Sequence, residues 1–266
     1  MELNVPTMAE MAAKGETPDV LFWVGCAGSF DQRAQKVTRS FVKILNHLGI
    51  KFAVLGTEES CTGDPAKRAG NEFVFQMLAM QNIEVMNSYG VKNVVTTCPH
   101  CFNIMKNEYP ALGGKYKVTH HSQFLQKLID EGKIKITEGG IFKGKKITYH
   151  DSCYLGRANE IYEAPRKVLE ELDADLVEMT SCKTKGLCCG AGGAQMFKEE
   201  EHGSIRINQE RTNQALATGA SIVAAACPFC NTMITDGVKG KDMQATVKVF
   251  DIAELLAAGQ GLETIA

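Results

Sequence analysis

This sequence of 266 residues has no long apolar run, no excess of positive charge and no leader-like beginning. Nothing in it approaches the ~18 consecutive apolar residues that a membrane-spanning helix needs. Its 29 lysines and arginines are matched by 31 acidic residues, so it carries no basic footprint for nucleic acid. Residues 1–19 are mixed polar and acidic and lack the apolar segment of a signal peptide. We expect a cytoplasmic globular protein that binds no nucleic acid, with attachment to the inner face of a membrane through partners as the alternative.

Two sequence patterns of cofactor chemistry are also missing. The chain has no Cys-x2-Cys-x2-Cys-x3-Cys-Pro run, which is the ligand pattern of bacterial ferredoxins. The pair Gly192-Gly193 is not followed by Lys-Ser or Lys-Thr, so it is a weak signal for a phosphate cradle. Any redox chemistry in this chain is therefore expected to depend on partner proteins that carry other cofactors.

Cysteine is present in quantity, with ten residues, nine of which form two sets. Cytosolic thiols are kept reduced, so clustered cysteines indicate metal ligands or redox groups rather than structural disulfides. The alternative is a group of small buried apolar residues, which the repeated spacing disfavours. The first set is Cys26, Cys61, Cys98 and Cys101, and the second set is Cys153, Cys188, Cys189, Cys227 and Cys230.

The two sets repeat one pattern at a nearly constant interval. Cys26 and Cys61 each lie 127 residues before their counterparts in the second set, and Cys98 and Cys101 each lie 129 residues before theirs. Both sets end in a Cys-Pro-x-Cys word, at 98–101 and at 227–230. Such self-similarity is the signature of an internal duplication. We predict an N-terminal extension at 1–20, a first cysteine-rich repeat at 21–143 and a second at 144–266.

Both halves predict alternating strands and helices. Short apolar runs typical of buried strands lie at 20–25, 52–55, 91–97 and 116–119, and again at 146–150, 176–179, 221–226 and 247–250. Helical spacing separates them, as at 31–48 and in a long segment that Pro65 opens and Gly90 ends. This alternation predicts the α/β class, with two tandem Rossmann-like repeats that have parallel sheets and are related by a pseudo-twofold axis.

Four of the cysteines follow almost directly on predicted strands. They are Cys26 and Cys98 in the first half and Cys153 and Cys227 in the second. In parallel sheets, ligands gather beyond the carboxyl ends of the strands. We therefore predict that each set converges at the carboxyl edge of its own sheet, whatever the separation of its members in sequence.

The adjacent pair Cys188-Cys189 distinguishes the second set. Neighbouring side chains on a strand point to opposite faces, so both can serve one site only in a tight turn. Gly190, Gly192 and Gly193 allow such a turn, and they let backbone N–H groups approach sulfur and tune a negatively charged cluster. Five thiolates exceed the four ligands of a tetrahedral zinc, whereas a polynuclear iron–sulfur cluster can use all five.

The first set lacks the fifth cysteine. It reads Cys61-Thr62-Gly63 where the second reads Cys188-Cys189-Gly190. Four cysteines can hold zinc or an ordinary four-cysteine cluster, and the residues leave this choice open. A threonine hydroxyl is a poor substitute for a thiolate on soft iron. We therefore expect divergent roles, with redox chemistry at the second site and a relay or structural metal at the first.

The pattern Cys…Cys-Cys-Gly…Cys-Pro-x-Cys, present twice, resembles the cysteine-rich CCG domain family. That family includes the catalytic subunit of heterodisulfide reductase, lactate-utilisation and anaerobic glycerol-3-phosphate dehydrogenase subunits, and iron–sulfur oxidoreductases linked to electron-transfer flavoprotein. The resemblance extends from Leu21 to Leu256. The stretches 22–31, 61–68, 149–157 and 188–193 are similar to the flavoprotein-linked group in particular. The resemblance implies a noncubane [4Fe-4S] cluster on the second set, and a [4Fe-4S] cluster or zinc on the first.

The same resemblance implies an iron–sulfur oxidoreductase subunit that passes electrons. Its expected partners are a ferredoxin-domain iron–sulfur protein, membrane-bound in some relatives, and a flavoprotein or dehydrogenase, with a quinone-linked protein as acceptor. One alternative is the catalytic subunit of a thiol–disulfide reductase of the heterodisulfide type. Another is a zinc-stabilised scaffold without catalytic activity.

Several further residues allow more than one interpretation of their role. Cys182 belongs to neither repeat and is either incidental or a resolving thiol. The pair His120-His121 is interpreted as structural rather than as a proton donor or an interface residue, and His150-Asp151 either packs or donates a hydrogen bond to the cluster. Asp64, Lys67 and Arg68 form a solvated helix start or a docking patch. The aromatic and methionine stretch 73–80 is predicted to be core.

Overall fold

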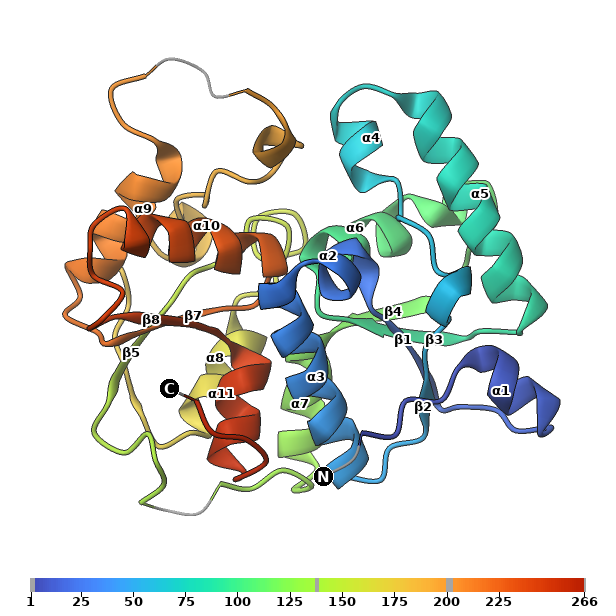
Figure 1. Cartoon of the computed structure of the whole chain (residues 1–266), viewed down its shortest axis with the longest axis horizontal. Coiled ribbons are helices and arrows are strands. Elements are labelled where there is room, and N and C mark those ends of the chain that lie inside the picture. The colour runs from blue at the N-terminus through green and yellow to red at the C-terminus, as the bar shows by residue number, and fades with distance from the viewer. Residues whose placement is uncertain (1–2, 137–138, 200–202, 266) are drawn as a thin grey trace. The chain divides into compact units, whose positions relative to one another are not determined.

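The computed structural model describes residues 3–136, 139–199 and 203–265 (Figure 1). The chain divides into two compact units, Met1–Phe124 and Leu125–Ala266. This division by packing assigns most of α7 and the segment after it to the second unit. The predicted repeat boundary at 143–144, which follows the sequence duplication, stays a prediction.

The first unit is built on a parallel sheet with the strand order β2-β1-β3-β4. Helix α3 and the start of α7 lie on one side of this sheet, and α5 and α6 lie on the other (Figure 1). The ring of Phe41 in α3 contacts that of Phe124 in α7, with 6.2 Å between centroids. The strands are β1 (Val20–Trp23), β2 (Phe52–Ala53), β3 (Asn93–Thr96) and β4 (Lys117–His120). The helices are α1 (Met8–Ala13), α2 (Gly25–Phe30), α3 (Gln32–His47), α4 (Asp64–Arg68), α5 (Glu72–Ser88), α6 (Pro99–Asn107) and α7 (His121–Asp130).

The second unit repeats this plan, with a parallel sheet in the order β6-β5-β7-β8. Helices α8 and α11 lie on one side, and α9 and α10 lie on the other (Figure 1). The strands are β5 (Lys146–Tyr149), β6 (Asp175–Leu176), β7 (Ile222–Ala225) and β8 (Lys248–Asp251). The helices are α8 (Glu163–Glu170), α9 (Ile207–Leu216), α10 (Pro228–Lys239) and α11 (Ile252–Gly259). The predicted α/β class with two similar parallel repeats is confirmed, and the pseudo-twofold relation between them stays a prediction.

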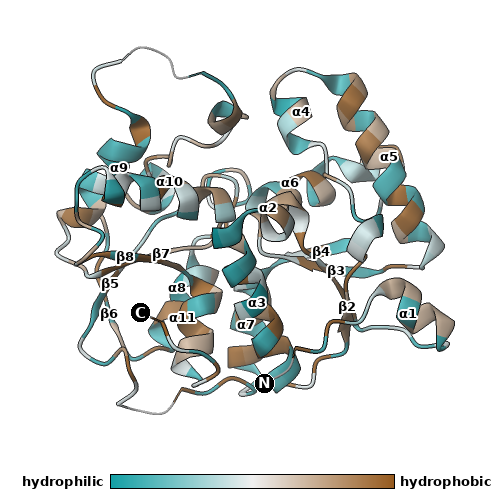
Figure 2. Cartoon of the chain, in the orientation of Figure 1, coloured by the Kyte–Doolittle hydropathy of each residue, from teal (hydrophilic) through white to brown (hydrophobic). Residues whose placement is uncertain are grey.

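The strands owe their position to their composition. Strands β1 and β7 are buried along their whole length and are among the most hydrophobic elements (Figure 2). Such continuous apolar runs are typical of parallel strands that helices cover on both faces. Among the described residues, no helix combines the length and the apolar character that crossing a bilayer requires.

The long helix predicted from Pro65 to Gly90 is wrong, because the chain breaks it into α4 and α5. Gly70 takes a left-handed backbone conformation with φ +87°, which ends α4. The side chain of Asn71 then accepts a hydrogen bond from the backbone N–H of Val74 at 3.1 Å and caps α5. The core prediction for 73–80 is also wrong in part, since Phe75 is buried but Phe73 is 78% exposed.

A close contact between α9 and α10 gives a test of the packing in the second unit. A Cβ atom added at Gly237 would lie 3.0 Å from Cβ of Thr212 and closer still to the hydroxyl of that residue. Gly237→Ala should therefore lower the free energy of unfolding by about 1–3 kcal/mol through overpacking, despite the better helix propensity of alanine. Chemical denaturation of the two proteins measures the difference. The double variant Gly237→Ala/Thr212→Ala should recover most of the loss, and a double variant as unstable as the single one would contradict the assigned contact.

Candidate metal centre

In the second unit, the second set gathers at the carboxyl ends of two neighbouring strands. Cys153 follows β5, Cys227 follows β7 directly, and Cys230 lies in the first turn of α10. Strands β5 and β7 pair with each other, while the connections that leave them run to opposite sides of the sheet. This is the switch point at which parallel sheets bind ligands.

A tight turn after β6 completes the set. Gly190 has φ +91°, which only glycine adopts at little cost, and its N–H donates to Sγ of Cys188 at 3.3 Å. The two adjacent cysteines then face different members of the set. Sγ of Cys188 lies 4.0 Å from Sγ of Cys153, and Sγ of Cys189 lies 3.2 Å from Sγ of Cys230. The turn thus aims both cysteines at one place, as the sequence predicts.

The five thiols of the second set influence one another strongly. Hydrogen bonds from Cys153 and Cys189 hold the pKa of Cys188 far below its usual range. The pKa values of Cys153 and Cys230 are raised, in each case first by the sulfur neighbour and then by burial. Cys227 also contributes to raising the pKa of Cys153, so the whole set forms one electrostatic group. A cation bound by these thiols would release their protons, because a metal-ligating cysteine is deprotonated.

The first set converges in the same way in the first unit. Cys26 lies in α2 after β1, Cys98 precedes α6, and Cys101 lies in its first turn. Gly63 has φ +85°, and its N–H is directed at Sγ of Cys61 at 3.5 Å. The hydrogen bond from Cys26 lowers the pKa of Cys61 to about 6, while the pKa of Cys26 is raised in turn.

Thr62 occupies the place of the fifth sulfur. Its hydroxyl Oγ1 lies 3.9 Å from Sγ of Cys101, as Cys189 Sγ lies beside Cys230 Sγ in the second unit. Thr62 is buried, and the phenol of Tyr109 donates to its carbonyl at 3.1 Å. The two turns therefore share a left-handed glycine, and a threonine hydroxyl in the first stands where the second has a thiol.

The charged residues near the first set form an internal network. Asp64 is buried and binds Nδ1 of His100 at 2.9 Å and Nε of Arg68 at 3.1 Å. Arg68 also pairs with Glu108, and Lys67 reaches the same carboxylate at 2.8 Å. The prediction of a solvated helix start or a docking patch is wrong for Asp64, because this carboxylate ties α4 to α6.

A buried carboxylate also lies beside the first set. Glu59 accepts the backbone N–H groups of Val24 and Gly25 at 3.0 and 2.6 Å, which fixes the turn that leads into α2. Burial raises the pKa of Glu59 to about 7, although both hydrogen bonds oppose the shift. A protonated Glu59 would leave the charge of the neighbouring thiolates undisturbed.

Two buried arginines surround the second set, and nothing in the local sequence predicts their burial. Arg166 holds both oxygens of Asp151, at 2.8 and 3.0 Å, and thereby fixes the chain next to Cys153. Arg211 in the polar helix α9 donates from Nε to Nδ1 of His150 at 2.9 Å. For Arg211 the repeat offers one signal, because the matching position of the first half holds a neutral asparagine, Asn82.

Three remaining candidates lie apart from the cysteine contacts described above, and the role of Cys182 stays a prediction. Cys182 has no hydrogen bond to another cysteine in the described part of the chain, and burial raises its pKa. His120 binds the hydroxyl of Ser122 at 2.8 Å and stacks edgewise on Phe102. Nδ1 of His121 lies 3.2 Å from Nε2 of His120. These contacts support the structural reading of the histidine pair.

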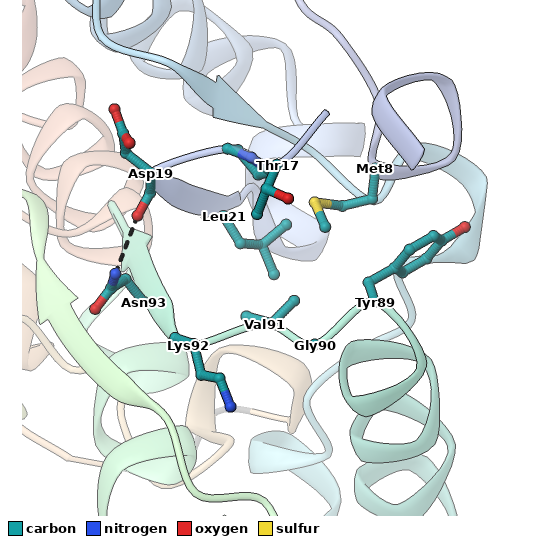
Figure 3. Close-up of a pocket in the computed structure, with 10 residues that line it drawn as sticks. Met8, Thr17, Asp19, Leu21, Tyr89, Gly90, Val91, Lys92 and Asn93 are labelled. Atoms are coloured by element: carbon teal, nitrogen blue, oxygen red, sulfur yellow. Dashed lines mark hydrogen bonds between the residues drawn. The ribbon is translucent and has the colours of Figure 1, made fainter. Parts of the chain in front are cut away.

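A cavity of about 270 Å³ opens in the first unit, at the amino ends of β1 and β3 (Figure 3). Met8, Leu21 and Tyr89 line its apolar part, and Asn93 donates to the carbonyl of Asp19 at 3.0 Å on its rim. The first set lies at the opposite, carboxyl ends of these strands. No cysteine is among the described residues that line this cavity.

Comparison with known proteins identifies relatives of the whole chain. The family model described as "Cysteine-rich domain" (CCG) matches residues 20–106 and again 147–235. The chain is 46% identical over 257 residues to the "Probable iron-sulfur-binding oxidoreductase FadF" of Bacillus subtilis, which covers 96% of this chain and 36% of that protein. It is 46% identical over 248 residues to the "EtfAB:quinone oxidoreductase" of Syntrophomonas wolfei, covering 91% of this chain and 34% of that protein.

A third relative is shorter. It is a component of the dihydromethanophenazine:CoB--CoM heterodisulfide reductase of Methanosarcina barkeri, and it is 38% identical over 253 residues, covering 92% of this chain and 60% of that protein. The chain thus spans about a third of the length of the first two relatives.

The lowered pKa of Cys61 gives a test in the reduced, metal-free protein. The thiolate of Cys61 should be present above pH about 6, whereas Cys182, whose pKa is raised, should need a pH above the ordinary thiol value of 9.0. Because the thiolate is the nucleophile, iodoacetamide should label Cys61 from about pH 6 upward and Cys182 only at alkaline pH. Mass spectrometry after brief labelling across a pH series measures both. Parallel pH dependences for the two cysteines would contradict the assigned hydrogen bond from Cys26.

Proposed function

Because this chain belongs to the cysteine-rich CCG domain family, we propose that it is an electron-transferring part of an iron–sulfur oxidoreductase and that its second set holds a noncubane [4Fe-4S] cluster. The observation that carries the proposal is the convergence of five sulfur atoms, including an adjacent pair, on one place in the second unit. The names of two relatives, an iron-sulfur-binding oxidoreductase and an EtfAB:quinone oxidoreductase, agree with it.

The donor set of the second unit fits this cofactor. All five side chains offer soft sulfur, the ligand type that iron–sulfur clusters use. A tetrahedral zinc would accept four of them and leave one thiol over. The N–H of Gly190, directed at Sγ of Cys188, is the kind of backbone donor that stabilises a negatively charged cluster.

Each cysteine of the second set has a distinct task in this proposal. When bound, the cluster supplies reversible one-electron transfer. Cys189, Cys227 and Cys230 are buried, so they bind it while keeping water away from its inner side. Cys153 and Cys188 are only half-buried and would form the edge at which a partner exchanges electrons. Arg166 holds Cys153 in place through Asp151.

The partners follow from the same argument. Neither a ferredoxin ligand run nor a nucleotide fingerprint occurs in this sequence, so the electrons must come from and go to other cofactors. We propose a flavoprotein or dehydrogenase on one side, and a ferredoxin-domain iron–sulfur protein on the other that leads to a quinone at a membrane. The name EtfAB:quinone oxidoreductase supports this order.

The first set supports a different role. Its four sulfurs suit zinc or an ordinary four-cysteine [4Fe-4S] cluster, and Thr62 offers only a hydroxyl in the fifth place. The network around Asp64 and His100 ties its turn to α6. We propose that the first site is a relay or a structural metal site and that the second site performs the redox chemistry.

A disulfide reductase is the second candidate function. One relative is named as part of a heterodisulfide reductase, and the half-buried Cys153 and Cys188 would let a disulfide approach the same edge of the second site. Reduction of a model disulfide by the chemically reduced protein, with release of two thiols, would favour this function over electron transfer alone.

The five-ligand hypothesis predicts the behaviour of two serine variants. Cys189→Ser should lose or convert the cluster while the fold survives, because the sheet does not rest on this side chain. Cys182→Ser is the matched control, since Cys182 is not bonded to the set, and it should retain full metal loading. Iron, sulfide and zinc per chain after anaerobic purification, together with electron paramagnetic resonance, measure both. Unchanged iron content and spectra in Cys189→Ser would show that the fifth sulfur is not a ligand.

Exchange of the residue in the fifth place, Thr62 against Cys189, should exchange the ligand number of the two sites. Thr62→Cys adds a fifth sulfur beside Cys101 and should give the first site the spectroscopic signature of the second. Cys189→Thr makes the reverse change and should leave the second site with the signature of the first. A Thr62→Cys variant with the metal content and spectra of the unaltered protein would contradict the view that Thr62 sets the difference.

A further inference from the structure

A histidine and an arginine from different elements lie fully buried behind the second set. His150 follows β5, and Arg211 lies within α9. Nε of Arg211 donates to Nδ1 of His150 at 2.9 Å. Nη1 of Arg211 donates to the carbonyl of Ser181 at 2.6 Å and to the amide oxygen of Gln214 at 2.8 Å. Among the described residues, the guanidinium therefore has only neutral hydrogen-bond partners.

The contact with Arg211 fixes the tautomer of His150. A guanidinium donates and never accepts, so Nδ1 must be the acceptor and the ring proton must be on Nε2. The N–H at Nε2 is buried and has no partner among the described residues. A buried donor left unpaired destabilises the folded protein, so an acceptor is to be expected beside it.

The sulfur atoms of the second set lie close to His150. A ring nitrogen of His150 and the Sγ atoms of Cys189 and Cys230 all lie within 4.8 Å of one another. Because Arg211 already occupies Nδ1, Nε2–H is the ring group that can donate toward these sulfurs, and it makes no hydrogen bond among the described residues. Thiolates and cluster sulfides accept hydrogen bonds, and such bonds set the potential of iron–sulfur centres.

The buried positive charge of Arg211 is stabilised by negative charge nearby. A buried cation is costly unless an anion offsets it. Asp151 is the carboxylate that favours the Arg211 charge most, and it also binds Arg166, which Glu178 binds as well. Cys230 and Cys189 are among the other groups that favour the Arg211 charge. A cluster held by deprotonated cysteines would add further negative charge on this side.

We propose that His150 donates a hydrogen bond from Nε2 to Sγ of Cys189 or Cys230, or to the cluster that they bind, and that Arg211 holds His150 in the orientation and tautomer for this bond. The inference rests on the proposed function, because it needs an iron–sulfur cluster at the second site. Uptake of one electron adds a negative charge to the cluster, and both residues stabilise that charge. The pair therefore raises the reduction potential of the second site.

The first repeat has a counterpart of His150 but none of Arg211. Trp23 stands at the position that matches His150, and its buried Nε1–H also has no partner among the described residues. At the position that matches Arg211, helix α5 carries Asn82, whose neutral amide donates to the carbonyl of Cys61 at 3.0 Å. The aromatic N–H is thus common to both repeats, and the buried cation belongs to the second alone.

Redox titration of two His150 variants, with the cluster as the observable, tests the proposal. His150→Phe should bind iron and sulfide but show a lower midpoint potential, and the exchangeable proton coupled to the reduced cluster should disappear from double-resonance spectra. His150→Gln retains an N–H donor and should recover part of the potential. Arg211→Gln removes the cation and should also lower the potential. An unchanged potential and proton coupling in His150→Phe would overturn the inference.

A measurement on the unaltered protein covers the case in which His150→Phe fails to load. With 15N placed only in histidine, the reduced cluster should show one weak nitrogen coupling, as expected across an N–H···S bond. His100→Gln, a variant of the buried histidine beside the first set, should leave this coupling in place. The strong coupling of a direct iron ligand, or no coupling at all, would overturn the inference. An unaltered protein without iron and sulfide would instead overturn the proposed function itself.

Discussion

The parallel sheet is the constraint on which each candidate site depends. Neighbouring strands β5 and β7 end at the same edge, so Cys153 and Cys227 meet although 73 residues separate them in sequence. The left-handed Gly190 then turns the chain so that its N–H reaches Sγ of Cys188. The side chain between them, that of Cys189, faces Cys230 of the Cys-Pro-x-Cys word. The first unit uses the same two devices with Gly63. The sulfur arrangement is thus a consequence of the fold of each unit.

The two units differ in what surrounds this shared arrangement. In the first, a hydroxyl replaces the fifth sulfur, and an ion-pair network around Asp64 stiffens the turn. In the second, the fifth sulfur is present, and a buried arginine adds positive charge through His150. Positive charge and hydrogen-bond donors favour the reduced form of a cluster. These differences agree with a division in which the second site accepts electrons and the first serves another purpose.

The fold could be read from the sequence to a large extent, because its signals are local and repeated. Apolar runs located each of the eight strands in the described residues, and helix α3 agrees with the prediction for 31–48 to within one residue. The predicted helix from Pro65 failed at Gly70, where one left-handed residue outweighs an otherwise helical pattern. The prediction that 73–80 is core was wrong in part. The spacing of aromatic residues and methionines indicates one face of a helix, but it does not tell whether another element covers that face. Phe73 faces solvent, while Phe75 is buried.

The candidate site was predictable in its sulfurs and not in its surroundings. The spacing of the cysteines predicted the convergence of both sets and the glycine turn. The burial of Arg166 and Arg211 was not predicted, because an arginine in a helical sequence gives no local sign of whether the packing of its helix will bury it. For His150 the sequence left two interpretations open, packing or a hydrogen bond to the cluster, and the choice depends on which ring nitrogen Arg211 binds.

Anomalous diffraction from crystals of the anaerobically prepared protein, collected on both sides of the iron and zinc absorption edges, tests the central claim most directly. The account predicts iron at the second set, with density for one cluster that all five cysteine sulfurs contact, and a metal of either kind at the first set. Zinc at the second set, or iron there bound by only four of its cysteines, would contradict the claim that these five sulfurs form a single iron–sulfur site.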